Sequence, residues 1–168
     1  NYWKVFDMKI FITLLLSLVI FSCSSTTVEY RSATTALNSE EKPKEAERYA
    51  LDALEKSPND ALPAFFLATK IYGIHNTQYS SVKNVKKAVD YYKITLKIIS
   101  ESEDASSQKL EDPIQYIDDN GKVVHIKTIK EALNYYSHDF WWMLYNEATE
   151  IIKSNGDIDM AVDLYKEA

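Results

Sequence analysis

Three stretches of this chain share one helical pattern, and that repetition limits the folds available to it. The stretches are Glu45–Leu54, Lys87–Leu96 and Met160–Ala168. Each has an alanine, then Ala or Tyr four positions on, then a small residue; the sets are Ala46/Ala50/Ala53, Ala88/Tyr92/Thr95 and Ala161/Tyr165/Ala168. Residues at this spacing lie on one face of an α-helix. Small side chains on such a face let two antiparallel helices pack closely, while the aromatic ring fills the gap beside them.

Few residues interrupt this helical pattern. The 168 residues, enough for one ordinary domain, include only three Gly and four Pro. We expect a first helix from near Ser39, with Pro43 in its first turn, up to Ser57. Asp60 should cap a second helix that ends near Gly73, and a polar loop, Ile74–Ser81, is expected to follow it. Further helices are expected at about residues 85–99, 128–136, 139–154 and 157–168.

A short β-hairpin is predicted between these helices. The runs Ile114–Ile117 and Val123–Ile126 flank Asp118–Lys122, which contains Asn120-Gly121. Asn-Gly between two apolar runs is the strongest local hairpin signal. The acidic, Ser-rich stretch before it, residues 100–112, is expected to be a loop.

The repeated pattern resembles the second helix of a tetratricopeptide repeat. Ala64–Tyr72 and Tyr145–Ile152 look like first helices of such repeats, and Pro58 matches the proline that ends one. The resemblance implies an all-α, helical-hairpin solenoid over residues 39–168 with the small β-hairpin inserted. The copies are spaced more widely and less regularly than the family period of about 34 residues, so a generic helical bundle is the alternative. Because solenoids need terminal caps, we expect the chain to continue beyond Ala168.

The same resemblance implies a concave groove that binds a protein or peptide partner. The positions that match groove residues are Leu62, Phe65, Thr69 and Tyr72 in one repeat, and Met143, Asn146, Glu150 and Lys153 in the other. The first set is apolar and aromatic, so an apolar or amphipathic peptide is the expected ligand. The alternative is that the N-terminal tether or the inserted hairpin covers these aromatic side chains.

The chain has a dense aromatic cluster at Phe140–Tyr145. On a helix, Trp141, Tyr145, Ala148 and Ile152 share one face, which predicts that they belong to the core. Trp142 lies about 100° round the helix. It is either exposed at a partner surface or buried against a neighbouring repeat.

Residues 8–22 have the layout of a secretory signal. Lys9 follows Met8, and an apolar run from Ile10 to Phe21 is too short to span a bilayer comfortably. Ile20-Phe21-Ser22-Cys23 resembles the lipobox of bacterial lipoproteins. The resemblance implies cleavage before Cys23, the only cysteine, and acylation of that residue. The alternatives are an uncleaved anchor or an ordinary signal peptide with a chance cysteine. Residues 1–7 are interpreted as upstream sequence, and residues 23–38, rich in Ser and Thr, as a flexible tether.

No catalytic motif stands out in this sequence. His75, His125 and His138 make no metal-ligand or triad spacing with one another, so no enzyme activity, metal or cofactor is expected. The net charge of −6 argues against nucleic acid as a partner. Together these features predict a noncatalytic interaction scaffold, lipid-anchored through Cys23 in the bacterial cell envelope. Ser24 after Cys23 favours the outer membrane, facing the periplasm. The alternatives are a solute- or glycan-binding lipoprotein, or an accessory module of an enzyme.

Overall fold

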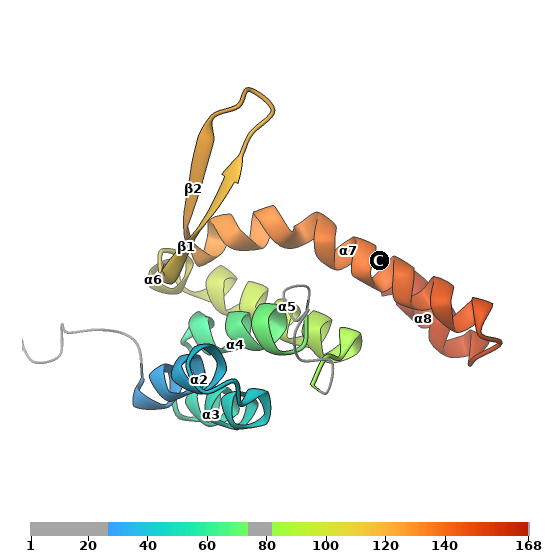
Figure 1. Cartoon of the computed structure of the whole chain (residues 1–168), viewed down its shortest axis with the longest axis horizontal. Coiled ribbons are helices and arrows are strands. Elements are labelled where there is room, and N and C mark those ends of the chain that lie inside the picture. The colour runs from blue at the N-terminus through green and yellow to red at the C-terminus, as the bar shows by residue number, and fades with distance from the viewer. Residues whose placement is uncertain (1–26, 74–81, 168) are drawn as a thin grey trace, which may run out of the picture.

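The apolar stretch Ala61–Ile71 lies at the centre of the structure. The computed structural model describes residues 27–73 and 82–167. In it, α4 (Ala61–Phe66) continues directly into a π-helical segment, η1 (Leu67–Ile71), and every residue from Ala61 to Thr69 is buried. A helix buried all round needs partners on every side. These partners are α3, α5 and α7, which contact α4, together with the Tyr30 ring of α2, which packs on Phe66 (Figure 1).

An antiparallel pair of helices, α2 (Val28–Asn38) and α3 (Pro43–Lys56), covers one side of this centre. Their contact is built from small side chains, Ala33 and Ala36 on α2 and Ala46, Ala50 and Ala53 on α3, all buried. Pro43 lies in the first turn of α3, as predicted, but the helix begins there and not near Ser39, which caps the end of α2. The predicted tether over residues 23–38 is wrong from Val28 onward, because Tyr30, Ala33 and Leu37 form a buried helical face.

A second long helix, α5 (Val85–Glu101), packs along both α4 and η1. The Asn84 side chain accepts a hydrogen bond from the Lys87 N–H and so caps its first turn. Both Ala88 and Thr95 of the repeated pattern are buried in the contact. The predicted helix over residues 85–99 is therefore confirmed. The predicted loop at Ile74–Ser81 lies outside the described residues.

A two-stranded antiparallel ribbon projects from the helical body (Figure 1). It consists of β1 (Lys109–Ile117) and β2 (Val123–Thr128), joined through Gly121, whose φ of 77° suits glycine. Asp118 accepts hydrogen bonds from the Asn120 and Lys122 N–H groups, which fixes the turn. The predicted hairpin is confirmed. The predicted loop before it is wrong in part, because residues 103–106 form α6 (Glu103–Ser106) and β1 already begins at Lys109.

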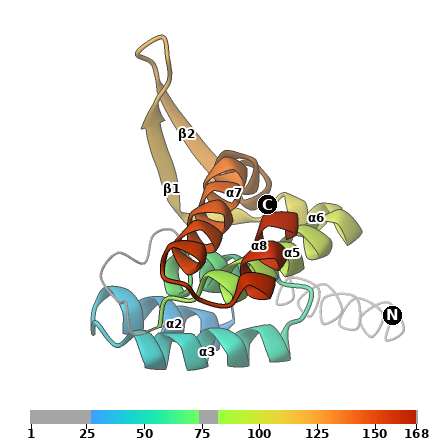
Figure 2. The same ribbon diagram turned by 90° about the vertical axis from the view of Figure 1, so that its right-hand side faces the viewer.

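One continuous helix, α7 (Ile129–Lys153), follows the ribbon, where two helices were predicted. Thr128 and Glu131 form a reciprocal capping box that starts it. Its buried face is formed by Ile129, Ala132, Leu133, Tyr136, Phe140, Leu144 and Ala148. α8 (Ile158–Glu167) turns back at Gly156 and packs chiefly on α7 (Figures 1 and 2).

The predicted all-α class and tetratricopeptide-like solenoid are wrong. The described helices range from 4 to 25 residues, and a β-ribbon stands between α6 and α7. The residues described thus form no stack of equal helix pairs. The repeated pattern has a simpler cause, because alanines at helical spacing suit any close helix pair. Tyr165, in the third copy of the pattern, is partly exposed instead of filling a gap between helices.

A buried polar contact joins the start of α4 to the strand that leads into the ribbon. Asp60 caps α4 as predicted, since its Oδ1 accepts from the Leu62 N–H at 3.0 Å. The same oxygen accepts from Gln108 Nε2 at 3.0 Å, and Gln108 Oε1 accepts from the Ala61 N–H at 3.0 Å. Asp60 is only 6% exposed, and its Oδ2 has no partner among the described residues. Burial raises the pKa of Asp60, while its bonds to Leu62 and Gln108 oppose that rise.

We predict that Gly73→Ala destabilises the protein by about 2–3 kcal/mol. A Cβ at Gly73 would overlap the backbone carbonyl oxygen of Ala68, at the end of the π-helical segment. Gly156→Ala is the matched control, because its nearest contacts are 3.1 Å away and include the movable side chain of Ile151. Urea unfolding measures both free energies. Equal losses for the two variants would contradict the close contact at Gly73.

The Asp60 carboxyl should make stability depend on pH. Its pKa is raised in the fold, so its contribution is most favourable below the unfolded value of about 3.9 and is lost as the pH rises through the folded value. Asp60→Asn keeps a cap acceptor but cannot ionise. We expect the stability of this variant relative to wild type to increase between about pH 3 and pH 7. Urea unfolding across that range tests this, and a difference independent of pH would refute it.

Candidate functional site

Five aromatic side chains form an exposed row on the outer side of α7 and α8, which we call the aromatic strip. Its members are His138, Trp141, Trp142 and Tyr145 of α7 and Tyr165 of α8. Trp142 is 49% exposed, and Trp141 and Tyr145 are each 39% exposed. Large apolar side chains gathered on one face in this way mark a binding surface more often than scattered ones do.

The rings of Trp141, Trp142 and Tyr145 stack on one another. The Tyr145 ring lies 5.6 Å from that of Trp141 and 5.5 Å from that of Trp142, at interplanar angles of 17° and 12°. Tyr165 meets Tyr145 edge to face at 5.4 Å, and its hydroxyl lies 2.9 Å from Thr149 Oγ1. These contacts hold the side chains in place without covering their outer faces. The strip is therefore an ordered surface that costs a ligand little side-chain entropy.

The strip is exposed because the buried face of α7 runs one residue away from the face that the sequence suggested. Phe140, Leu144 and Ala148 are buried, in line with Leu133 and Tyr136 of the preceding turns. The predicted core face is thus wrong for Trp141, Tyr145 and Ile152, which are exposed, and right for Ala148. The sequence prediction placed separate helices at residues 128–136 and 139–154, so the buried positions of the first were not extended into the second. In one continuous helix, the buried face of the first turns continues at the same helical spacing to the last.

A cleft of about 300 Å³ adjoins the strip, between α7 and the start of α5. It brings together three of the predicted partner-binding residues, Trp142, Met143 and Asn146. Val85 adds an apolar contact, and the charged side chains at the cleft are Lys83, Asp139, Glu147 and Glu150. Glu150 forms an ion pair with Lys153 at 2.8 Å. Partner binding by these residues stays a prediction.

The groove residues predicted for the first repeat lie in the core, so the prediction that they face an open groove is wrong. Lys153, predicted for the other repeat, is exposed. Leu62, Phe65, Thr69 and Tyr72 are all buried. Phe65 packs on Tyr136 at 6.3 Å, and Thr69 Oγ1 donates to the Phe65 carbonyl at 2.8 Å. The alternative, that the tether or the hairpin covers the aromatic side chains, is correct for Phe65, because residues of α2 and β1 line the cavity beside it. Leu62, Phe65 and Thr69 line a small cavity whose other walls come from α2, β1 and α7.

Tyr72 has a structural contact of its own. Its hydroxyl donates to Glu47 Oε1 at 2.5 Å, its ring stacks on Tyr91 at 5.6 Å, and the Lys87 ammonium lies 4.8 Å from its ring centre. Burial raises the pKa of Tyr72, and the Glu47 carboxylate raises it further. Burial likewise raises the pKa of Tyr136 to about 12. Both phenols therefore remain protonated at neutral pH, and the Tyr72 hydroxyl acts as a donor.

Several sequence predictions concern chemistry that the described residues do not test. Cys23 and His75 lie outside them. Within residues 27–73 and 82–167, no group of three His, Cys, Asp or Glu side chains is placed to hold a metal ion. In that same part of the chain, no helix combines the length and apolarity needed to cross a bilayer.

Comparison of the chain with models of known protein families gave no match, and comparison with curated proteins gave none either. The geometry of the strip and its cleft is therefore the basis on which a function can be proposed.

Proposed function

We propose that this chain is a noncatalytic binding protein whose aromatic strip docks a protein partner. The observation that carries the proposal is the exposure of Trp141, Trp142 and Tyr145 side by side on one helix. Tyr and Trp are enriched in protein interfaces and supply most of the residues that dominate binding energy. Each such side chain can bury roughly 150–250 Å². Three of them together can form the centre of a standard interface.

The cleft beside the strip supplies the polar rim that such an interface needs. Asn146 offers both a donor and an acceptor, while Asp139 and Glu147 add negative charge next to Trp142. An apolar centre bordered by polar groups is the usual anatomy of a protein–protein contact. The partner segment expected here is therefore amphipathic, with apolar side chains for the strip and polar or basic ones for the cleft.

The place of action that we propose is the bacterial cell envelope, with the protein held on the outer membrane by acyl chains on Cys23. The support is the order of Lys9, the apolar run and Cys23 in the sequence. Two or more acyl chains hold a protein firmly on a bilayer, since each buried methylene contributes about 0.8 kcal/mol. The helical part would then present its strip to other envelope proteins.

Glycan binding is the second candidate. It is favoured by the partial exposure of Trp142 and Tyr145 on one helix, because a ring-shaped ligand can stack on exposed aromatic side chains. A glycan would engage the strip without needing the charged cleft.

The partner proposal is tested by placing a photo-crosslinking amino acid at Trp142. We expect it to yield a covalent adduct with one envelope protein in cells. The matched control is Ile117, which is 71% exposed and lies next to the turn of the projecting ribbon. Adducts at Ile117 and none at Trp142 would reject the strip as the docking surface. Release of the adduct by glycosidase would favour the glycan candidate.

With that partner in hand, Trp141→Ala combined with Trp142→Ala should weaken its affinity at least about tenfold. Trp141 and Trp142 are only 39% and 49% exposed, but neither is a core residue, so the free energy of unfolding should change less than for a core substitution. Ile117→Ala should leave affinity unchanged. Isothermal titration measures the affinities and urea unfolding the stabilities. Undiminished affinity in the folded double variant would remove the strip from the interface.

The anchor has a separate test, because Cys23 is the only cysteine. Cys23→Ala should abolish metabolic labelling with palmitate and leave the protein either soluble or with its signal uncleaved. The wild-type chain, expressed at the same level, is the control. Labelling of equal intensity in the two proteins would eliminate Cys23 as the acylated residue.

A further inference from the structure

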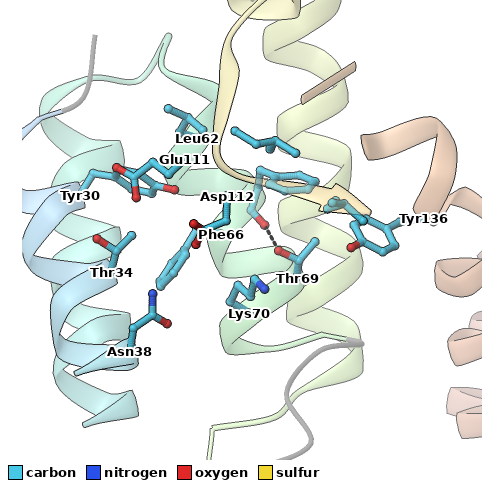
Figure 3. A pocket seen from close by; sticks show the side chains of 13 residues that line it. Tyr30, Thr34, Asn38, Leu62, Phe66, Thr69, Lys70, Glu111, Asp112 and Tyr136 are labelled. Atoms are coloured by element: carbon cyan, nitrogen blue, oxygen red, sulfur yellow. Dashed lines mark hydrogen bonds between the residues drawn. The ribbon is translucent and has the colours of Figure 1, made fainter. Parts of the chain in front are cut away.

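A second site, separate from the aromatic strip, is a cavity between α2, the α4–η1 helix, β1 and α7. Its volume is about 100 Å³ (Figure 3). Tyr30, Phe65 and Tyr136 each come from a different helix and meet at its walls. A cavity enclosed by four elements keeps its shape better than a surface groove, so it is preformed for a ligand.

Two irregular stretches of backbone build this cavity, one on each side. The first is the π-helical segment η1, which brings Thr69 and Lys70 to the lining. The second lies in β1, where Lys109 pairs with Thr128 but the next paired residue, Ile114, pairs with Ile126. The strand therefore bows outward between these pairs and carries Leu110, Glu111 and Asp112 over the cavity mouth.

Both irregularities are the kind that occur near functional sites. π-Helical turns and β-bulges disturb regular hydrogen bonding, and bulges re-aim side chains toward sites. A regular strand from Lys109 to Ile114 would not place three successive residues at this mouth. The π-helical segment and the bulge in β1 both give up regular backbone hydrogen bonding, and both border this one cavity. Packing alone gives no reason for that loss.

The inner wall of the cavity is apolar and small. Leu62, Phe65, Phe66 and Ile114 line it. A cavity of about 150 Å³ holds a benzene molecule, so the smaller space here suits a branched aliphatic side chain. It is well below the 300 Å³ or more that drug-sized ligands occupy.

The rim of the cavity carries both signs of charge. Figure 3 shows Glu111 beside Tyr30 at one end, Asn38 and Lys70 at the other, and Asp112 between them. No salt bridge joins Lys70 to either carboxylate within the part of the chain that the structure describes. Burial and the neighbouring Asp112 raise the pKa of Glu111, while Arg31 lowers it. A ligand cation would relieve the repulsion between these two carboxylates.

We infer that this cavity binds a small zwitterion with a branched apolar tail, the chemistry of an aliphatic α-amino acid. The tail occupies the wall formed by Leu62 and Phe65. The ligand ammonium meets Asp112, and its carboxylate meets Lys70 and the Asn38 amide. Each charged end of the ligand then faces an opposite charge on the rim, which is the arrangement that gives specificity.

Isothermal titration of the full-length protein in detergent with L-leucine tests this inference. Leucine is expected to bind, whereas three probes that each lack one part of it should bind at least about tenfold more weakly. These probes are glycine without the tail, isoamylamine without the carboxylate, and isocaproate without the ammonium. No heat of binding with leucine up to about 10 mM would overturn the inference. Isoamylamine or isocaproate binding as tightly as leucine would overturn it too.

Charge variants assign the two ends of the ligand. Lys70→Gln should weaken leucine at least about tenfold while leaving isoamylamine binding unchanged, and Asp112→Asn should weaken leucine while leaving isocaproate unchanged. Both residues are exposed, so neither variant threatens folding. Lys44→Gln on α3 is the matched control with unaltered leucine binding. Equal loss of leucine binding in Lys44→Gln and Lys70→Gln would show a nonspecific charge effect and reject the assignment.

Discussion

The burial of Ala61–Thr69 on all sides is the constraint on which the remaining structure depends. Before Lys70 this segment has no solvent-facing side, so it cannot be stable alone and must be packed against by α3, α5 and α7. On the side of α2, the Tyr30 ring packs on Phe66. Its first turn is capped by Asp60, which also holds Gln108 at the base of the ribbon. The position of the ribbon is thus set by the same contact that starts the central helix.

The two proposed sites share α7 but use opposite aspects of it. Tyr136, on the buried face, lines the cavity, whereas Trp141 and Trp142, on the exposed face, belong to the strip. Because these residues lie on one uninterrupted helix, their relative positions are fixed by helix geometry and not by a loop. A change of register in α7 would therefore disturb both sites together.

The parts of this fold that local chemistry determines could be read from the sequence. Pro43 and Asn120-Gly121 correctly marked the start of a helix and the turn of the hairpin, because such residues act through their own backbone geometry. The Ser/Thr-rich composition around α2 concealed the buried spacing of Tyr30, Ala33 and Leu37. That helix is held by its contact with α3, which no local signal reports.

The candidate sites were less accessible to sequence reasoning for the same reason. Trp142, Met143 and Asn146 were identified together, but the exposure of Trp141 and Tyr145 depends on the register that Leu133 and Tyr136 impose from earlier turns. That signal was present in the spacing of Leu133, Tyr136, Phe140 and Leu144. The cavity left no such trace, because neither the π-helical turn nor the bulge in β1 has a local sequence signature of the kind that Asn120-Gly121 provides for the hairpin.

The attachment of α8 to α7 has a consequence for cooperativity. Since α8 packs chiefly on α7, it can separate from its neighbour without exposing the central helix, and its local stability is lower than that of the whole domain. Tyr165 is the member of the strip that α8 contributes. A partner that contacts Trp142 and Tyr165 together would hold α8 in place, so that association and the ordering of this last helix would become a single thermodynamic event.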